Sequence, residues 1–449
     1  MLSRSLFTFF LLSGLFAAHA QAGLFNPKVS KLANGMDVVV IEDHRAPVVT
    51  HMVWFRAGSA DEPIGQSGIA HFLEHLIFKG TESMAGAEFS EIIARNGGRE
   101  NAFTSFDFTG YYQNLASSKL SLVMELFADR MTNLSITNAD VETERQVILE
   151  ERNSRVENDP GSLFSEQMAA AQFLASHYGI PIIGWKHEME KLSRKNALDW
   201  YETYYPPNNA ILVVAGDVKA AEVFELAKKH YGPLTARPVP ERLRPQEPPQ
   251  LAARRLFYHD ARITQPSMQR SYLAPSRLAG AKQHALPLGI LSDILGGGAT
   301  SRLHRKLVVE DKIAAGAGSY YSGMRFARTR FGVYATPSPD TDIEKLEPAV
   351  DHVIAELLKN GVTEEEVARA KFGMSASAIY ARDNMFSGAR IFGRALSVGL
   401  SVKDVESWPE RIEEVTVQQV NEAAAYIFKK EQSVTGFMLP EAAGTEGKK

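Results

Sequence analysis

The strongest constraint on the fold is an order of segments that occurs twice, on either side of a proline- and arginine-rich stretch at residues 233–249. In the first half, strands are expected at 29–32, 36–41, 48–55 and 210–215, with two more within 102–114, and helices at 68–78, 87–95, 117–133, 138–156 and 220–231. In the second half, strands are expected at 254–259, 267–273, 316–324 and 331–335, and helices at 283–295, 302–308, 343–360 and 364–382. The pattern predicts an α+β fold of two homologous α/β halves, each an antiparallel-rich sheet covered by helices.

The chain length also predicts more than one domain. A chain of 449 residues exceeds what a single hydrophobic core usually organises. The proline-rich stretch cannot form a regular β-ladder and is typical of a linker. We therefore divide the chain into a signal peptide at 1–20, an N-terminal half at 21–236, a linker at 237–253 and a C-terminal half at 254–449.

The first twenty residues have the pattern of a secretory signal peptide. Arg4 precedes an apolar stretch at 6–18, and the sequence Ala18-His19-Ala20 predicts cleavage before Gln21. No later apolar run is long enough for a membrane span, so we expect a mature chain without an anchor, located in the periplasm. Loss of the single arginine in this peptide changes the formal charge from −4 to −5. Such a weak acidic balance predicts no nucleic-acid partner.

The candidate chemistry lies in one short motif. Because the chain contains no cysteine, any zinc must be bound by histidine and carboxylate. The sequence His71-Phe72-Leu73-Glu74-His75 places two histidines four residues apart within an expected helix. Both side chains then lie on one face and can reach one ion, and Glu74 lies on the same side. This inverted H-x-x-E-H spacing is typical of a zinc site in which the carboxylate takes a proton from the catalytic water.

A catalytic zinc needs a third protein ligand, and a carboxylate from another helix is its natural source. The helix expected at 138–156 contains four candidates, namely Glu142, Glu144, Glu150 and Glu151. Glu144 and Glu151 are seven residues apart and share one face over about 10 Å, whereas Glu150 points elsewhere. A solvated acidic face is the alternative interpretation of this helix.

Further short motifs follow in register along the chain. They are Leu32-x-Asn34-Gly35, Gly58-Ser59-x-x-Glu62, Gly97-Gly98-x-x-Asn101-Ala102-Phe103-Thr104 and Tyr205-Pro206-x-Asn208. Together with H-x-x-E-H and the Glu-x6-Glu spacing that ends at Glu151, they resemble the pitrilysin family of inverzincin peptidases. This family includes insulin-degrading enzyme and the mitochondrial processing peptidases, and the resemblance covers nearly the whole mature chain.

The resemblance implies a role for each motif residue. It implies one zinc ion per chain, bound by His71, His75 and Glu151. It implies that Glu74 is the general base and that Glu144 orients a zinc-binding histidine. It places Asn101 and Ala102 on an edge strand that pairs with the backbone of a peptide substrate. The two halves are then expected to form half of a clamshell around short or unfolded peptides.

The second half departs from the family pattern. Active members usually carry an arginine and, seven residues later, a tyrosine in this half. Aligned on the segment 296–303, this chain has Val308 and Ala315 at those positions. Since such polar groups commonly contribute a factor of about a hundred or more in rate, we expect a zinc-bearing subunit whose homologous partner supplies an Arg-x6-Tyr pair. Two alternatives stay open: a self-sufficient homodimeric or monomeric peptidase, and a non-catalytic peptide-binding scaffold.

Overall fold

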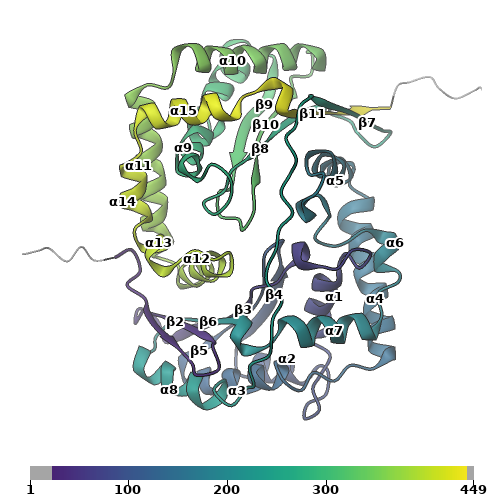
Figure 1. The fold of residues 1–449 in the computed structure, drawn as a ribbon, viewed down its shortest axis with the longest axis vertical. Coiled ribbons are helices and arrows are strands. Elements are labelled where there is room, and N and C mark those ends of the chain that lie inside the picture. The colour runs from purple at the N-terminus through teal and green to yellow at the C-terminus, as the bar shows by residue number, and fades with distance from the viewer. Residues whose placement is uncertain (1–22, 442–449) are drawn as a thin grey trace, which may run out of the picture.

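The chain folds into two β-sheets surrounded by helices (Figure 1). A computed structural model describes residues 23–441, so the predicted signal peptide lies outside the described residues. The first sheet contains β1 (Lys28–Lys31), β2 (Asp37–Glu42), β3 (Val48–Phe55), β4 (Arg99–Thr104), β5 (Thr109–Ala116) and β6 (Ala210–Gly216). The second contains β7 (Arg254–Asp260), β8 (Ser267–Ala274), β9 (Ala314–Tyr321), β10 (Thr329–Pro337) and β11 (Ser433–Pro440). Each sheet draws its strands from one half of the chain.

The two sheets share one strand arrangement. The order is β1-β2-β6-β3-β5-β4 in the first sheet and β7-β11-β8-β10-β9 in the second. A parallel pair, β2 with β6 or β7 with β11, is followed in both sheets by three antiparallel pairs. Apart from β1, the corresponding strands also occur in the same order along the chain. This correspondence confirms the predicted α+β fold of two similar halves.

Helices cover the sheets on both faces. Those of the first half are α1 (Ile69–Leu76), α2 (Glu88–Arg95), α3 (Leu120–Arg130), α4 (Asn138–Arg152), α5 (Pro160–Gln172), α6 (Lys186–Met189), α7 (Arg194–Tyr204) and α8 (Ala220–His230). Those of the second half are α9 (Ala285–Gly296), α10 (Leu346–Asn360), α11 (Glu364–Ala381), α12 (Met385–Ser397), α13 (Val402–Glu406), α14 (Trp408–Glu413) and α15 (Val417–Ile427). Alternate residues of β2, such as Val38 and Val39, lie in different apolar clusters, because both faces of the sheet are buried.

Each half contributes one helix to the sheet of the other half. Helix α12 packs on β3 and β6 of the first sheet, where Phe392 and Trp54 lie in one buried cluster. Helix α5 packs on β7 and β11 of the second sheet, where Phe164 shares a cluster with Val434. Figure 1 shows both exchanges, with α12 beside the lower sheet and α5 beside β11. The exchange joins the two halves through apolar packing.

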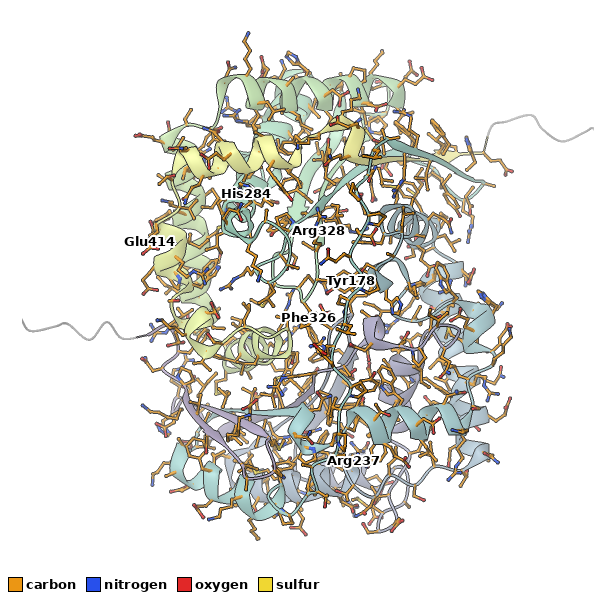
Figure 2. The ribbon with its side chains drawn as sticks, viewed as in Figure 1. Tyr178, Arg237, His284, Phe326, Arg328 and Glu414 are labelled. Carbon is orange, nitrogen blue, oxygen red and sulfur yellow. The ribbon has the colours of Figure 1, made fainter. Side chains whose placement is uncertain are left out.

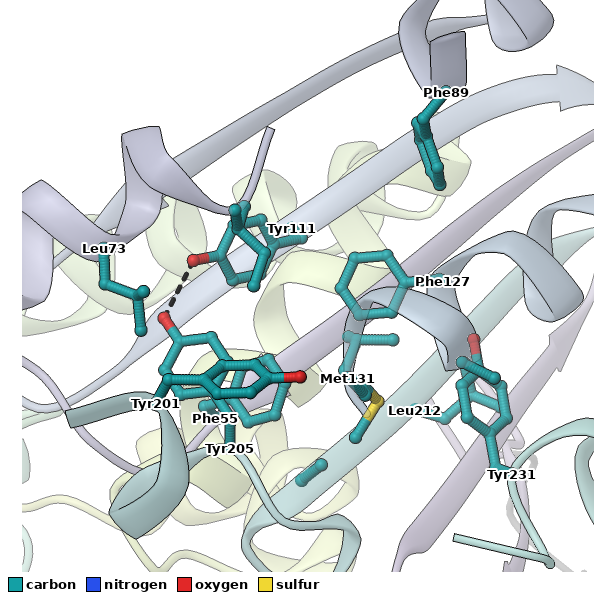
Figure 3. Packing of buried hydrophobic residues seen from close by; sticks show 14 of the residues in the cluster. Phe55, Leu73, Phe89, Tyr111, Phe127, Met131, Tyr201, Tyr205, Leu212 and Tyr231 are labelled. Atoms are coloured by element: carbon teal, nitrogen blue, oxygen red, sulfur yellow. Dashed lines mark hydrogen bonds between the residues drawn. The ribbon is translucent and has the colours of Figure 1, made fainter. Parts of the chain in front are cut away.

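An aromatic core supports helix α1 (Figure 3). Leu73 of α1 is fully buried in this core, together with Tyr111 of β5 and Tyr205. The hydroxyl groups of the two tyrosines are hydrogen-bonded at 2.8 Å, and Tyr205 stacks on Phe55 with 4.0 Å between ring centroids. Burial of side chains of this size stabilises a fold by about 1.5–3 kcal/mol each. The core therefore fixes one side of α1 and leaves its other side for polar residues.

The structure contains elements that the sequence pattern did not reveal. These are α5, α6, α7, α12 to α15 and β11. The expected hairpin at residues 29–41 is present as the antiparallel β1–β2 pair, but β3 does not continue it, because β6 lies between β2 and β3. The expected helix at 302–308 is a π-helical segment, η7 (His304–Glu310), and a second π-helical segment, η3 (Asn153–Glu157), follows α4.

The segment between α8 and β7 contains no helix or strand. Two of its arginines bind to the N-terminal half: Arg244 lies 2.6 Å from Asp61 and 3.3 Å from Asp107, and Arg242 donates to the Asp107 carbonyl. The division of the chain into domains at this segment stays a prediction. Within residues 23–441, no helix has the length and apolar character needed to cross a membrane.

Candidate metal centre and active site

Helix α1 begins at a glycine that tolerates no side chain. Gly68 has φ of +89°, and a Cβ placed there would lie 2.6 Å from the Ile183 carbonyl oxygen. A left-handed backbone of this kind strongly favours glycine. The buried carboxylate of Glu62 accepts hydrogen bonds at 2.9 Å from the N–H groups of Gly68 and Ala70. It thereby satisfies two of the donors that a helix leaves free at its N-terminus.

Three of the predicted residues converge at one point. His71 and His75 lie one turn apart on α1, with 4.7 Å between their ring centroids. Their Nε2 atoms lie 3.6 Å and 3.3 Å from Oε2 of Glu151, which comes from α4. One ligand atom from each residue lies within 4.8 Å of the other two. The structure thus brings together the two histidines of the motif and the carboxylate that the resemblance named as the third ligand.

Glu144 lies two turns before Glu151 and contacts the other side of His75. The Nδ1–H of His75 donates to Oε1 of Glu144 at 2.8 Å, and Glu144 also pairs with Lys79. Because Nδ1 carries the proton in this hydrogen bond, Nε2 of His75 is directed toward His71 and Glu151. The position of Glu144 matches the orienting role that the resemblance implied.

The two histidines have opposite proton affinities. Burial, reinforced by the nearby charge of His75, lowers the pKa of His71 to about 4. Burial also opposes the charged form of His75, but hydrogen bonds to Glu144 and Glu151 outweigh it and raise the pKa of His75 to about 9. His71 is therefore neutral at pH 7, whereas His75 holds a proton that a bound cation would replace.

Glu74 lies beside this cluster and is buried. Its side chain is only 9 % exposed, and burial raises the pKa of its carboxyl group to about 7 although a hydrogen bond from Thr104 favours the charged form. The Thr104 hydroxyl donates to Oε2 of Glu74 at 2.5 Å. A carboxyl group with a pKa near the working pH can both accept and release a proton.

Strand β4 carries the predicted substrate-binding residues along one edge of the first sheet. Among the strands of residues 23–441 it pairs with β5 only, so within this part of the chain its other side has free backbone groups. Asn101 is exposed, and its side-chain oxygen accepts a hydrogen bond at 2.8 Å from the N–H of Ala102. A free sheet edge of this kind can pair with an extended peptide. The Asn101 side chain must move aside when another strand takes up that N–H.

Sequence reasoning missed several neighbours of the cluster. Arg155 lies 2.6 Å from Oε1 of Glu151, and the i, i+4 spacing of this pair was a signal that could have revealed it. Lys79 pairs with Glu144 and lies four residues after His75. Glu62 and Thr104 were seen as parts of motifs but received no role, because their contacts with α1 depend on the loop and sheet that carry them.

Val308 and Ala315, which stand where active family members have arginine and tyrosine, differ in burial and in the element that carries them. Val308 of η7 is half-buried and packs on the second apolar core, and Ala315 is exposed on the edge strand β9. Two polar residues nearby, Arg305 and Tyr321, already have contacts within the chain. Arg305 lies 3.9 Å from Glu310, and the hydroxyl of Tyr321 donates to the Pro275 carbonyl at 2.7 Å.

The cluster suits zinc by its donor set and charge. Two imidazoles and one carboxylate are a ligand set that catalytic zinc sites use, with a further position left for water or substrate. Glu144 supplies the hydrogen-bond partner that a metal-binding His75 requires, whereas the buried Nδ1 of His71 has no such partner within the described residues. The residues that would bind the metal are His71, His75 and Glu151.

Comparison with known proteins agrees with this site. Residues 37–185 match the family model described as Insulinase (Peptidase family M16), and residues 191–374 match the model described as Peptidase M16 inactive domain. Zinc protease PqqE of Helicobacter pylori is 31 % identical over 94 % of this chain and 95 % of that protein. The chain belongs to peptidase family M16. This membership confirms the predicted pitrilysin-type family and supports a peptidase function.

Other M16 relatives extend the comparison. The probable β subunit of the mitochondrial processing peptidase of Arabidopsis thaliana is 27 % identical over 91 % of this chain and 77 % of that protein. The crystal structure of a protease from Helicobacter pylori has a TM-score of 0.86 and 29 % identity, and the match covers 92 % of this chain and 99 % of that one. The periplasmic protease PqqL of Escherichia coli shares the fold with a TM-score of 0.79 at 19 % identity. That match covers 92 % of this chain and 47 % of PqqL.

Proposed function

We propose that this M16 chain is a secreted, zinc-dependent endopeptidase that hydrolyses short or unfolded peptides. One observation carries the proposal. Three ligand atoms from two helices converge within 4.8 Å, directly beside a buried carboxyl group whose pKa is about 7. A purely structural metal has no use for such a base, whereas peptide hydrolysis requires one. Names of relatives such as zinc protease PqqE support the same conclusion.

The residues of the site have different roles in hydrolysis. His71, His75 and Glu151 hold one zinc ion, which supplies Lewis-acid activation of water and carbonyl when bound. Glu74 accepts a proton from the attacking water and passes it to the leaving amine. The hydrogen bond from Thr104 occupies Oε2 of Glu74, which leaves Oε1 for this proton.

The edge strand β4 orients the peptide substrate. A peptide that pairs with Asn101 and Ala102 of β4 is held extended, and its backbone rather than its side chains provides most of the binding. Glu144 keeps the His75 ring in place during the reaction, because its hydrogen bond fixes both the tautomer and the ring orientation.

The chain acts as the zinc-bearing subunit of a heterodimer. Val308 and Ala315 cannot donate hydrogen bonds from their side chains to a tetrahedral intermediate, and Tyr321 is already bound to Pro275. A homologous subunit that carries an Arg-x6-Tyr pair supplies the missing donors, and the two subunits close as a clamshell around the peptide. The N-terminal pattern at residues 1–20 supports export to the periplasm.

The test is hydrolysis of an unstructured fluorogenic peptide by the purified mature chain, alone and with a candidate partner. The partner should carry Arg-x6-Tyr and lack H-x-x-E-H. We expect activity in the mixture only, with one zinc per copy of this chain. Equal activity of the chain alone would favour a self-sufficient peptidase. Tight peptide binding without hydrolysis in any mixture would favour the scaffold.

A further inference from the structure

Three arginines gather beside the end of β4 that reaches the active site. Arg325 lies in the loop between β9 and β10, and Arg390 and Arg394 lie on α12. We call them the arginine cluster. Within residues 23–441 none of the three forms an ion pair, whereas the neighbouring acids Asp61 and Asp107 are paired with Arg242 and Arg244 of the linker. The nearest carboxylate, that of Asp107, also acts on Arg394 but is shared with the two linker arginines, so within this part of the chain the three guanidinium groups of the cluster have no ion-pair partner of their own.

The cluster contacts the residues next to Thr104. The Nη1 of Arg325 donates to the Ser105 hydroxyl at 3.3 Å. The guanidinium of Arg390 lies 5.7 Å from the ring centre of Phe103. Phe103 and Ser105 flank Thr104, whose hydroxyl binds the general base Glu74. The loop that carries Arg325 reaches the middle of the molecule, where Figure 2 labels its neighbour Phe326 close to Tyr178.

Two of the guanidinium groups, those of Arg325 and Arg390, lie over aromatic rings. Arg325 lies 5.3 Å from the ring centre of Phe106, and exposed Arg390 also lies 5.6 Å from that of Phe386. Stacking on an aromatic ring uses the face of a guanidinium and leaves its in-plane N–H groups for an acceptor. The matching acceptor is a carboxylate, which a guanidinium binds through two parallel hydrogen bonds.

Arg394 contributes a third, half-buried charge. It donates to the Ser322 hydroxyl at 2.9 Å, but its Nε is buried without an acceptor. Burial lowers the pKa of Arg394, and the charges of Arg325 and Arg390 lower it further, although the charge of Asp107 opposes the shift. Three like charges near one another are costly unless an anion joins them.

The position of the arginine cluster beside β4 defines which side chains of a bound peptide would contact it. Along a strand, successive side chains point to opposite faces. Thr104 points to the face of α1, where Glu74 lies, and Phe103 points to the face of α12. A peptide paired with β4 therefore directs alternate side chains toward Glu74 and toward Arg390.

We infer that the arginine cluster is a substrate subsite that binds a carboxylate of the peptide, supplied by an aspartate or glutamate side chain or by the C-terminus. The inference rests on the proposed function, because it requires a peptide that lies along β4. It adds a preference for acidic substrates to an otherwise backbone-directed mode of binding. The preference should weaken at high ionic strength, because Arg390 is exposed.

Binding to the Glu74→Gln protein tests the subsite without requiring turnover. A peptide series carries Glu, Gln or Lys at each position in turn, and each peptide is prepared with a free and an amidated C-terminus. We expect at least one Glu peptide to bind about tenfold more tightly than its Gln counterpart. The added change Arg390→Gln should reduce this ratio to about twofold or less, and Arg390→Glu should reverse it in favour of Lys. Arg325→Gln provides a second variant, and Arg369→Gln on α11 removes the same charge elsewhere as a control.

The outcomes separate the inference from the proposed function. Loss of affinity on side-chain neutralisation identifies an acidic side chain as the ligand, and loss on amidation identifies the C-terminal carboxylate. Both results support the subsite. Peptides that bind, and are hydrolysed by the wild-type protein, without any charge preference would overturn the subsite and leave the peptidase intact. If no peptide binds or is hydrolysed in any mixture, both proposals fail.

Discussion

The two halves of this M16 protein have the same sheet but differ in the helix beside the edge strand. In the first half, α1 contacts β4 and presents His71, Glu74 and His75. In the second half, α9 contacts β9 in the same way, but its buried residues are apolar apart from Ser292, and its only charged side chain is Asp293. Within the described residues, metal-type ligands converge only in the first half.

The difference teaches that the fold and the site are separable. Both sheets are stabilised by apolar side chains on two faces, and these contacts do not involve the ligand atoms. Leu73 anchors α1 in its core, and at 100° per residue it lies on the side of the helix opposite to His71 and His75. A duplicated fold can therefore keep a reactive cluster in one half and fill the corresponding place in the other half with apolar residues.

The largest effect should come from removing a ligand in the first half. His71→Ala leaves two of the three ligands, so zinc should be lost and peptide hydrolysis should fall by a factor of about ten thousand or more. Zinc content by atomic emission, measured beside activity, checks both effects, and chelation of the wild-type protein should reproduce the loss. His352→Ala, which removes an exposed histidine of the second half, is the matched control. Full zinc content in His71→Ala would remove this residue from the ligand set.

Glu74→Gln should separate chemistry from metal binding. Glutamine keeps the size of the side chain but cannot take a proton, so kcat should fall by a factor of about a thousand or more while zinc content stays at one per chain. Asp293→Asn makes the same change in the helix of the second half and should leave kcat unchanged. Retained activity in Glu74→Gln would show that another group is the base.

The helix exchange should make the two halves unfold together. Phe392→Ala in α12 and Phe164→Ala in α5 each remove a fully buried ring and should each lower the free energy of unfolding by about 3–5 kcal/mol. Each change lies at a contact between the halves, so thermal unfolding should remain a single transition. Calorimetry measures both quantities, with exposed Phe372→Ala as control. Two separate transitions would show that the halves are energetically independent.

Glu144→Gln should produce an intermediate effect. The variant keeps the three metal ligands but weakens the hydrogen bond that orients His75, so zinc affinity should fall by about 10- to 100-fold. Competition with a chromogenic chelator measures this affinity. Glu142→Gln, on the exposed face of the same helix, should leave it unchanged. An equal loss in both variants would indicate a general effect of charge on α4.

The smallest effect should come from replacing Asp293 of α9, and it concerns the pH dependence of folding stability. Burial raises the pKa of Asp293 in the folded state, so its charged form opposes folding. The stability that its protonated form supports is present below the unfolded pKa and is lost as pH rises through the folded pKa. Asp293→Asn should therefore gain stability relative to wild type as pH rises from about 3 to 6, by less than about 1 kcal/mol because the group is half-buried. Denaturant unfolding across this pH range measures the difference, and a difference independent of pH would contradict it.

Spacing indicated which side chains of the site share a helix face, and the resemblance indicated which of them are the ligands. Two histidines four apart and two glutamates seven apart each define one face of a helix, whatever the rest of the chain does. The Thr104 contact with Glu74 and the Glu62 bonds to α1 could not be predicted in this way, because they join segments whose distance is set by the sheet and its loops. The arginine cluster is the extreme case, since Arg325 and Arg390 come from elements more than 200 residues beyond β4.

The sequence by itself determined the two-sheet plan, the metal-type motif and the family, because hydrophobic periodicity and residue spacing are local properties that survive in any α+β packing of these segments. The insertion of β6 between β2 and β3, the exchange of α5 and α12, and the assembly of the arginine cluster were decided by the tertiary structure. These features depend on which apolar surface covers which sheet face. The pairing of apolar surfaces that leaves the least apolar area exposed depends on the whole chain, so it cannot be predicted from a short segment of sequence.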